Sequence, residues 1–268
     1  MKRSLTKVLL AVLALSAPAV MAQDRATVTL SGQAKQTSPG QAAVDRAAAA
    51  QKYIFIFFWK DKNLQTDKAW SVLQPAVANM AGSAEVVSIQ ITNPAEKRIV
   101  DKYDATRAPM PLVLAVAPCG VITKAFTKTF DENQLRAAFV SPCTQLCLKA
   151  LRSRKLVLAC VVDQANPQDS VTIPKGVEDF RADAKFGSAT EIVLVNARDQ
   201  GEATLLKEFQ VDPQTQKPVI VFLAPPGAMI GKFDGSTTKQ QLLAKLAAAQ
   251  SNPCAGGKCG PGGCGPKK

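Results

Sequence analysis

The fold is decided by Pro111-Leu-Val-Leu-Ala-Val-Ala-Pro-Cys-Gly120, a stretch that returns at an offset of 107 residues (218 − 111) as Pro218-Val-Ile-Val-Phe-Leu-Ala-Pro-Pro-Gly227. In both copies a short, continuously apolar run leads into a turn with glycine, which predicts a buried strand followed by a hairpin. The match continues downstream without a gap, since Phe126 corresponds to Phe233. A repeat of two copies indicates a duplicated domain rather than a solenoid.

Each copy starts with a helix that begins at Ser-Pro, expected over 39–52 and 142–153, because proline suits the first helical position. A short apolar strand of the kind buried on both faces of a sheet follows, over 53–59 and 156–162. The other elements expected in the first copy are a helix through 70–80, strand 86–92, helix 94–103, the Pro-led strand, strand 121–126 and helix 131–140. The second copy is expected to have a helix through 177–184, strand 191–196, helix 202–209, the Pro-led strand, strand 228–233 and helix 237–249. This order predicts an α/β fold of two tandem domains, 23–140 and 141–249, each with a mixed central sheet flanked by helices.

This order of elements, with a proline just before the third strand and a glycine hairpin after it, resembles the thioredoxin-like fold superfamily. The resemblance covers residues 38–140 and 141–249. In that superfamily a cis proline opens the third strand and holds extended substrate backbone beside the active-site thiols. The match places Met110-Pro111 at that position in the first domain and Lys217-Pro218 in the second. A proline there also serves simply to set the angle at which the strand begins, and both interpretations stay open.

The chain departs from the superfamily where its members carry Phe-Trp and then, after three residues, Cys-x-x-Cys. Phe58-Trp59 is present, but Asn63-Leu-Gln-Thr66 stands where the cysteines are expected. Asn63 and Thr66 suit the start of a helix, whereas dithiol chemistry needs a thiolate there. The second copy has Asp163-Gln-Ala-Asn-Pro167 after its strand, so neither copy has the usual redox motif.

The resemblance without its thiols implies grooves that hold a protein or peptide partner. The expected groove residues are Trp59, Asn63, Thr66, Met110 and Pro111 in the first domain and Lys217 and Pro218 in the second. We therefore expect first a non-catalytic binding or scaffold protein with no catalytic residue.

The first 22 residues have the pattern of an export signal. Basic residues precede an apolar run over 8–17, and Val20-Met-Ala22 offers small side chains where signal peptidase cuts. The apolar run is too short to span a bilayer stably, which argues against a membrane anchor. We expect a signal peptide over 1–22, a mature chain that starts at Gln23 without a membrane span, and a periplasmic or secreted location.

The composition excludes several classes of site. The chain has no histidine, so a Ser-His-Asp triad, a Cys-His pair and a His-ligated metal are impossible within it. The formal net charge is +12, but Lys and Arg are scattered among acidic residues, without a basic stripe interleaved with aromatics. This pattern is typical of a solubilising surface and not of nucleic-acid binding.

Four of the seven cysteines lie before the tail. Cys160 falls in an apolar strand and is expected to be a small core residue, and Cys119 is expected to be an exposed turn residue. Cys143 and Cys147 are four residues apart near the start of a helix, so they point to one face, and the helix dipole favours a thiolate at Cys143. Packing or a disulfide at the helix start, redox work and metal binding are all open for this pair.

The remaining cysteines, Cys254, Cys259 and Cys264, lie in a Gly- and Pro-rich tail expected over 250–268. Such a composition does not bury a core, so the three sulfurs are free to converge on one ion. Three thiolates without imidazole suit Cu(I), or Zn with a further ligand. In an oxidising compartment disulfides are the competing interpretation. An unstructured remnant without a function is the third. The alternative functions are therefore soft-metal handling by the tail and thiol-disulfide exchange by displaced cysteines.

Overall fold

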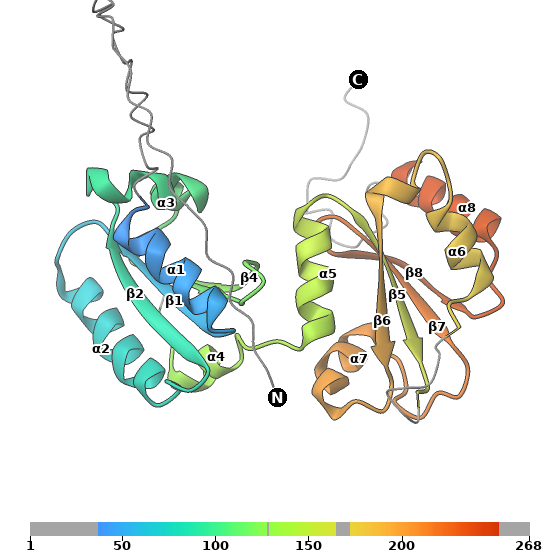
Figure 1. Cartoon of the computed structure of the whole chain (residues 1–268), viewed down its shortest axis with the longest axis horizontal. Helices are drawn as coiled ribbons and strands as arrows, with labels where there is room; N and C mark the ends of the chain where they lie inside the picture. Colours follow the sequence, from blue (N-terminus) through green and yellow to red (C-terminus); the bar gives the residue numbers. More distant parts are fainter. Residues whose placement is uncertain (1–36, 128, 165–171, 252–268) are drawn as a thin grey trace, which may run out of the picture. The chain divides into compact units, whose positions relative to one another are not determined.

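The computed structural model describes residues 37–127, 129–164 and 172–251, which form two domains of the same design (Figure 1). Each domain has a four-stranded sheet, with strand order β2-β1-β3-β4 in the first and β6-β5-β7-β8 in the second. Among the described helices, none has both the length and the apolarity that a bilayer span requires. The predicted signal peptide over 1–22 and the tail from residue 252 onward lie outside the described residues.

The elements follow the expected order in both domains. The first domain contains α1 (Pro39–Ala49), β1 (Tyr53–Trp59), α2 (Leu64–Ala78), β2 (Ala84–Gln90), α3 (Lys97–Lys102), β3 (Leu112–Val116), β4 (Ile122–Phe126) and α4 (Glu132–Arg136). The second contains α5 (Pro142–Arg152), β5 (Leu156–Val162), α6 (Lys175–Arg181), β6 (Thr190–Asn196), α7 (Ala203–Phe209), β7 (Val219–Ala224), β8 (Ala228–Asp234) and α8 (Lys239–Ser251). Short 3₁₀ turns stand at Pro94–Glu96, Ala105–Arg107, Gly187–Ala189 and Gln200–Glu202.

The sheets are mixed, as the sequence predicts. In the first domain β1 runs parallel to β2 and antiparallel to β3, and β4 closes the hairpin. The second domain repeats these pairings with β5 between β6 and β7. The predicted fold, an α/β fold of two domains with helices flanking a mixed sheet, is therefore confirmed.

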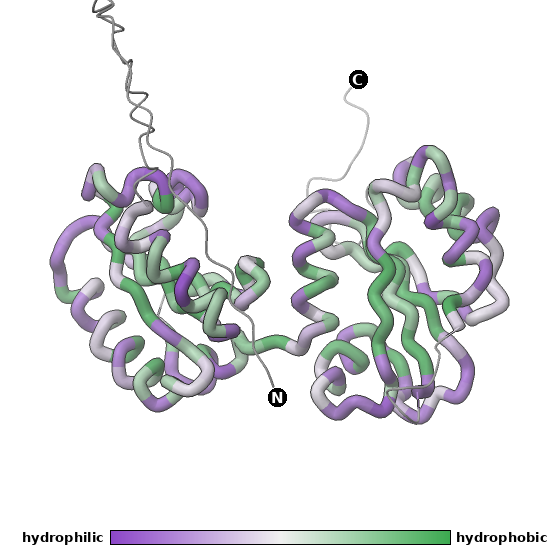
Figure 2. Tube along the Cα trace, in the orientation of Figure 1, coloured by the Kyte–Doolittle hydropathy of each residue, from purple (hydrophilic) through white to green (hydrophobic). Residues whose placement is uncertain are grey.

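The central strand of each sheet is apolar throughout because both of its faces are covered. In β1, Phe55 and Phe57 pack against α2 and α4, whereas Ile54, Ile56 and Phe58 pack against α1 and α3. The same alternation in β5 faces α6 and α8 on one side and α5 and α7 on the other. The strands accordingly stand out as hydrophobic segments between helices of mixed character (Figure 2).

In each domain a buried glutamate from a later segment contacts the start of the first helix. The sequence analysis does not predict this contact. Glu96, 6% exposed, accepts the Gly40 backbone N–H at 3.0 Å, and Glu202, 2% exposed, accepts the Cys143 backbone N–H at 3.1 Å. The Ser141 hydroxyl also donates to Glu202. These carboxylates satisfy amides that the first turn of a helix leaves without an intrahelical partner.

Several helices are shorter than expected, since α1 ends at Ala49, α3 begins only after a 3₁₀ turn at Pro94–Glu96, and α4 covers half of its expected range. The helix expected over 131–140 ends at Arg136, because the chain then turns so that Phe139 packs against the Tyr53 ring, with 4.5 Å between ring centroids. In the second domain α6 spans seven residues, where its counterpart α2 spans fifteen. The face that α6 covers is therefore less extensive than the face under α2.

Substituting a core residue tests whether each domain depends on its own core. Leu158 in β5 is fully buried, so Leu158→Ala is expected to lower the free energy of unfolding of the second domain by about 2–5 kcal/mol. Both tryptophans, Trp59 and Trp70, lie in the first domain. In urea the circular dichroism transition should therefore move to lower concentration while the tryptophan fluorescence transition stays in place.

The matched control is Leu146→Ala, because Leu146 is 49% exposed and its truncation should cost less than about 0.5 kcal/mol. If Leu158→Ala moves the fluorescence transition as far as the circular dichroism transition, the domains unfold as one unit and the expectation is wrong.

Candidate functional site

The peptide bond before β3 is cis in the first domain. Met110-Pro111 is one of two cis bonds in the described chain, and the other, Pro225-Pro226, lies in the β7–β8 turn. Lys217-Pro218 is therefore trans, so the second domain lacks the feature that the resemblance suggests at this position. Within the described residues, the backbone N–H and C=O of Met110 make no hydrogen bond. Met110 thus offers an unused donor and acceptor directly before a fixed bend of the chain.

The residues opposite this bend are held by strand pairing and by one side-chain hydrogen bond. Phe58 pairs with Leu112 across β1 and β3, which brings the end of β1 beside Pro111. Trp59 follows, half-buried, and its Nε1 donates to the Ser88 hydroxyl at 2.9 Å. The structure therefore gathers Trp59, Met110 and Pro111 at one end of the sheet.

The start of α2 uses Asn63 and Thr66 for its own closure. The Asn63 side-chain oxygen accepts the backbone N–H groups of Gln65 and Thr66 at 3.0 and 2.9 Å, as expected for an N-cap. Thr66 is 6% exposed, and its hydroxyl donates to the Asp61 carbonyl at 2.9 Å. Both residues stand where the sequence analysis places them, but their polar atoms are engaged within the loop.

An apolar groove of about 580 Å³ runs between α2 and the segment after β4, and Pro111 contributes to its lining. The other lining residues are Leu64, Gln65, Lys68, Ala69, Ser71, Val72, Thr127, Thr129 and Phe130. Leu64 is 79% exposed and Val72 is 40% exposed, which is high for large apolar side chains. Of the expected groove residues, only Pro111 lines this groove, and the prediction for the others stays untested.

The groove residues on α2 are not evident from the sequence, because they lie next to the more strongly apolar buried stripe of that helix. Leu64, Lys68 and Val72 recur at a spacing of four, which puts them on one face next to the stripe that contains Leu73 and Val77. The signal that points to this face is Leu64 and Val72, two apolar residues on either side of Lys68 and outside the buried stripe.

Comparison with known proteins concerns the fold. No family model matches the sequence, and no curated protein is significantly similar to it. Similar solved structures include the first two thioredoxin domains of Saccharomyces cerevisiae Eps1p, with 12% identity, TM-score 0.31, and coverage of 72% of this chain and 88% of that one. Zinc-bound human ERp44 has 10% identity, TM-score 0.35, and coverage of 78% of this chain and 60% of that one. A disulphide isomerase from Xylella fastidiosa Temecula1 has 23% identity, TM-score 0.27, and coverage of 38% and 83%.

The decisive observation is the strand order in each domain together with the order of elements along the chain. Both domains have a thioredoxin-like fold. All three TM-scores lie below 0.5, so the fold assignment rests on the topology of the chain and not on these structures.

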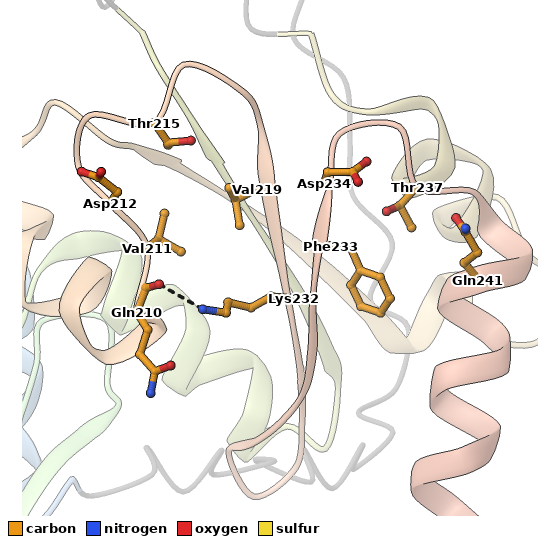
Figure 3. A pocket seen from close by; sticks show the side chains of 10 residues that line it. All are labelled: Gln210, Val211, Asp212, Thr215, Val219, Lys232, Phe233, Asp234, Thr237 and Gln241. Carbon is orange, nitrogen blue, oxygen red and sulfur yellow. Dashed lines mark hydrogen bonds between the residues drawn. The ribbon is translucent and has the colours of Figure 1, made fainter.

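The second thioredoxin-like domain has a pocket of a different character at the matching end of its sheet (Figure 3). It encloses about 620 Å³ between the α7–β7 segment and β8, and Val219, next to Pro218, lines it. Lys232 spans this pocket, and its Nζ donates to the Gln210 carbonyl at 3.0 Å (Figure 3). Lys217 is exposed and Pro218 half-buried, and neither lines the pocket. The pocket is thus partly polar, and its lysine is already engaged.

Cys143 and Cys147 lie in the second domain in surroundings that oppose a thiolate. Cys147 is buried, and burial raises its pKa to about 12. Cys143 is half-buried, and its Sγ lies 3.3 Å from the Leu194 carbonyl. Burial first, and then the Glu202 carboxylate beside it, raise the pKa of Cys143 to about 12. The sequence analysis expects the helix dipole to favour a thiolate at Cys143. Burial of the thiol and the carboxylate at the start of the helix disfavour the thiolate instead.

The other cysteines add no metal centre to the described residues. Cys160 is fully buried and Cys119 is exposed, and all four described cysteines are free thiols. Across 37–127, 129–164 and 172–251, no three His, Cys, Asp or Glu side chains gather into a metal-binding group. The predicted metal ligands Cys254, Cys259 and Cys264 lie outside the described residues, so a Cu(I) or Zn site there stays a prediction.

Removing the Glu202 charge tests the electrostatic control of Cys143. In Glu202→Gln the pKa of Cys143 should fall, because the nearby negative charge that disfavours the thiolate is gone. At pH 8 the alkylation rate by iodoacetamide should rise about tenfold for each unit by which the pKa falls. The rate is read by mass spectrometry on the peptide that contains Cys143.

Exposed Glu208 supplies the control, since Glu208→Gln removes a charge from the same region of sequence without touching Cys143. Equal alkylation rates in Glu202→Gln and the unmodified protein would contradict the assignment.

Proposed function

We propose that this chain is a non-catalytic thioredoxin-like protein that binds an extended segment of a partner protein through its first domain. The observation that carries the proposal is the Met110 backbone, which has no hydrogen-bond partner in the described structure and stands beside a proline that lines an apolar groove. An extended segment can pair with that N–H and C=O as a strand pairs with a sheet edge. Its side chains then have the groove for burial.

The chemistry at the start of α2 supports binding without exchange. No sulfur stands between Trp59 and Thr66, and the first free amides of the helix are occupied by Asn63. Cys143 and Cys147 do not replace the missing pair, because their pKa values are raised far above the working range of a nucleophilic thiolate.

The exposed apolar side chains support the same conclusion. Leu64 and Val72 lie on a helix whose other face is well packed, so their exposure is not required by the fold. Apolar side chains that gather along a groove favour association with another molecule. Burying a leucine of this size contributes about 1.5–3 kcal/mol to binding, a large share for a short peptide.

The site is tested by a charge placed in the groove. Peptides selected by display from a random twelve-residue library on the full chain should bind at least about tenfold more weakly to Leu64→Asp, because a carboxylate would have to be desolvated there. Aspartate is well tolerated in the first turn of a helix, so α2 should remain folded by circular dichroism. Affinity is measured by fluorescence anisotropy with the labelled peptides.

Leu146→Asp is the matched control, because Leu146 is an exposed leucine on α5 of the second domain. The proposal fails if the library yields no binding peptide, or if both variants bind the selected peptides as tightly as the unmodified chain does.

We also propose that the chain is exported by its N-terminal signal, on the evidence of the apolar run over 8–17 and the small residues Val20-Met-Ala22. Expressed in a Gram-negative bacterium, the chain should be recovered from the periplasmic fraction, and its N-terminal sequence should begin at Gln23. Replacing Ala22 with a bulky residue, as in Ala22→Trp, should block that cleavage, since signal peptidase requires a small side chain at this position. An unprocessed chain confined to the cytoplasm would contradict the proposal.

A further inference from the structure

The α2 face of the groove has an alternating chemical character that narrows what it can bind. Leu64, Lys68 and Val72 follow one another along one face of the helix, so an ammonium stands between two apolar side chains. Among the described residues that line the groove, Lys68 is the charged one. The rest of the lining consists of apolar side chains and uncharged polar groups.

The Lys68 ammonium is unpaired in the described structure. Other lysines are held by carboxylates, such as Lys97 by Asp101 at 2.6 Å and Lys175 by Asp179 at 2.8 Å. Lys68 makes no ion pair and its Nζ donates no hydrogen bond to a described residue. A carboxylate of a ligand could therefore pair with the Lys68 ammonium without breaking an existing ion pair.

The spacing of the three side chains matches that of an extended peptide. Residues four apart on a helix are separated by about 6 Å along its axis, and alternate residues of a strand by about 6.6 Å. A strand lying along α2 would therefore place residues i, i+2 and i+4 against Leu64, Lys68 and Val72. An apolar, then an acidic, then an apolar residue at these three positions would satisfy all three contacts.

We propose that the groove selects extended segments in which an acidic side chain stands between two apolar ones at alternate positions, and that Lys68 is the residue that selects the acid. This inference rests on the proposed function, because it specifies the partner of the same groove. Apolar walls strengthen the attraction between the Lys68 ammonium and an acidic side chain relative to an open surface. They also strengthen the repulsion between Lys68 and a basic residue at the central position.

Three labelled peptides test the inference. They share Leu-Ser-Xaa-Ser-Leu within an uncharged frame and differ only at Xaa, which is Glu, Gln or Lys. At low salt the Glu peptide should bind the full chain about tenfold more tightly than the Lys peptide, with Gln between them, and the difference should shrink as salt screens the charge. Lys68→Glu should reverse the order, and Lys68→Gln should remove it.

Lys149→Glu provides the control, since Lys149 is an exposed lysine on α5 and the same change there should leave the order of the three peptides intact. Equal affinities for the three peptides would overturn the inference and leave the proposed function standing. Preference for the Glu peptide that survives Lys68→Glu would also overturn it. If neither these peptides nor those selected from the random library bind, the proposed function fails as well.

Discussion

Both domains depend on a central strand that is buried on both faces. β1 and β5 are covered on both faces, so each sheet needs helices on both sides, and the helices that connect its first three strands lie on opposite faces. That requirement fixes where α1 and α5 begin, with their first turns over the sheet and partly withdrawn from water. It also places the ends of β1 and β3 side by side, where Pro111 opens the groove.

The buried helix starts explain the thiol environment. Amides at the beginning of α1 and α5 need acceptors once water is excluded. Glu96 and Glu202 supply these acceptors from the 3₁₀ turns that follow β2 and β6. Gly40 leaves no side chain near Glu96, whereas Cys143 occupies the equivalent place beside Glu202. Burial is the main cause of the raised pKa of the Cys143 thiol, and the carboxylate that satisfies the backbone raises it further. The packing of the helix start therefore disfavours a thiolate at this position.

An interaction was predictable from the sequence when its partners lie close together along the chain or when burial leaves a direct pattern. The strands were predictable because continuous apolar runs such as 53–59 and 156–162 report burial directly, and the repeat fixed their order. Asn63 was recognisable as a cap because its partners lie two and three residues on. The two glutamates were not recognisable, since their partners lie 56 and 59 residues away. Nor was the trans bond at Lys217-Pro218, because a matching proline does not fix its own isomer.

The absence of cysteine between Trp59 and Thr66 and the presence of Pro111 together determine the chemistry of the groove. A helix start that carries a thiolate must direct its free amides at the sulfur, but here Asn63 takes the amides of Gln65 and Thr66 for itself. The helix start therefore has few free amides for an anion. The positive charge that a ligand can meet is the Lys68 ammonium, one turn further along α2. Among the described residues, what remains is the Met110 backbone without a hydrogen-bond partner, apolar walls and the Lys68 ammonium. We propose that these groups bind and orient an extended chain without forming or breaking a bond in it.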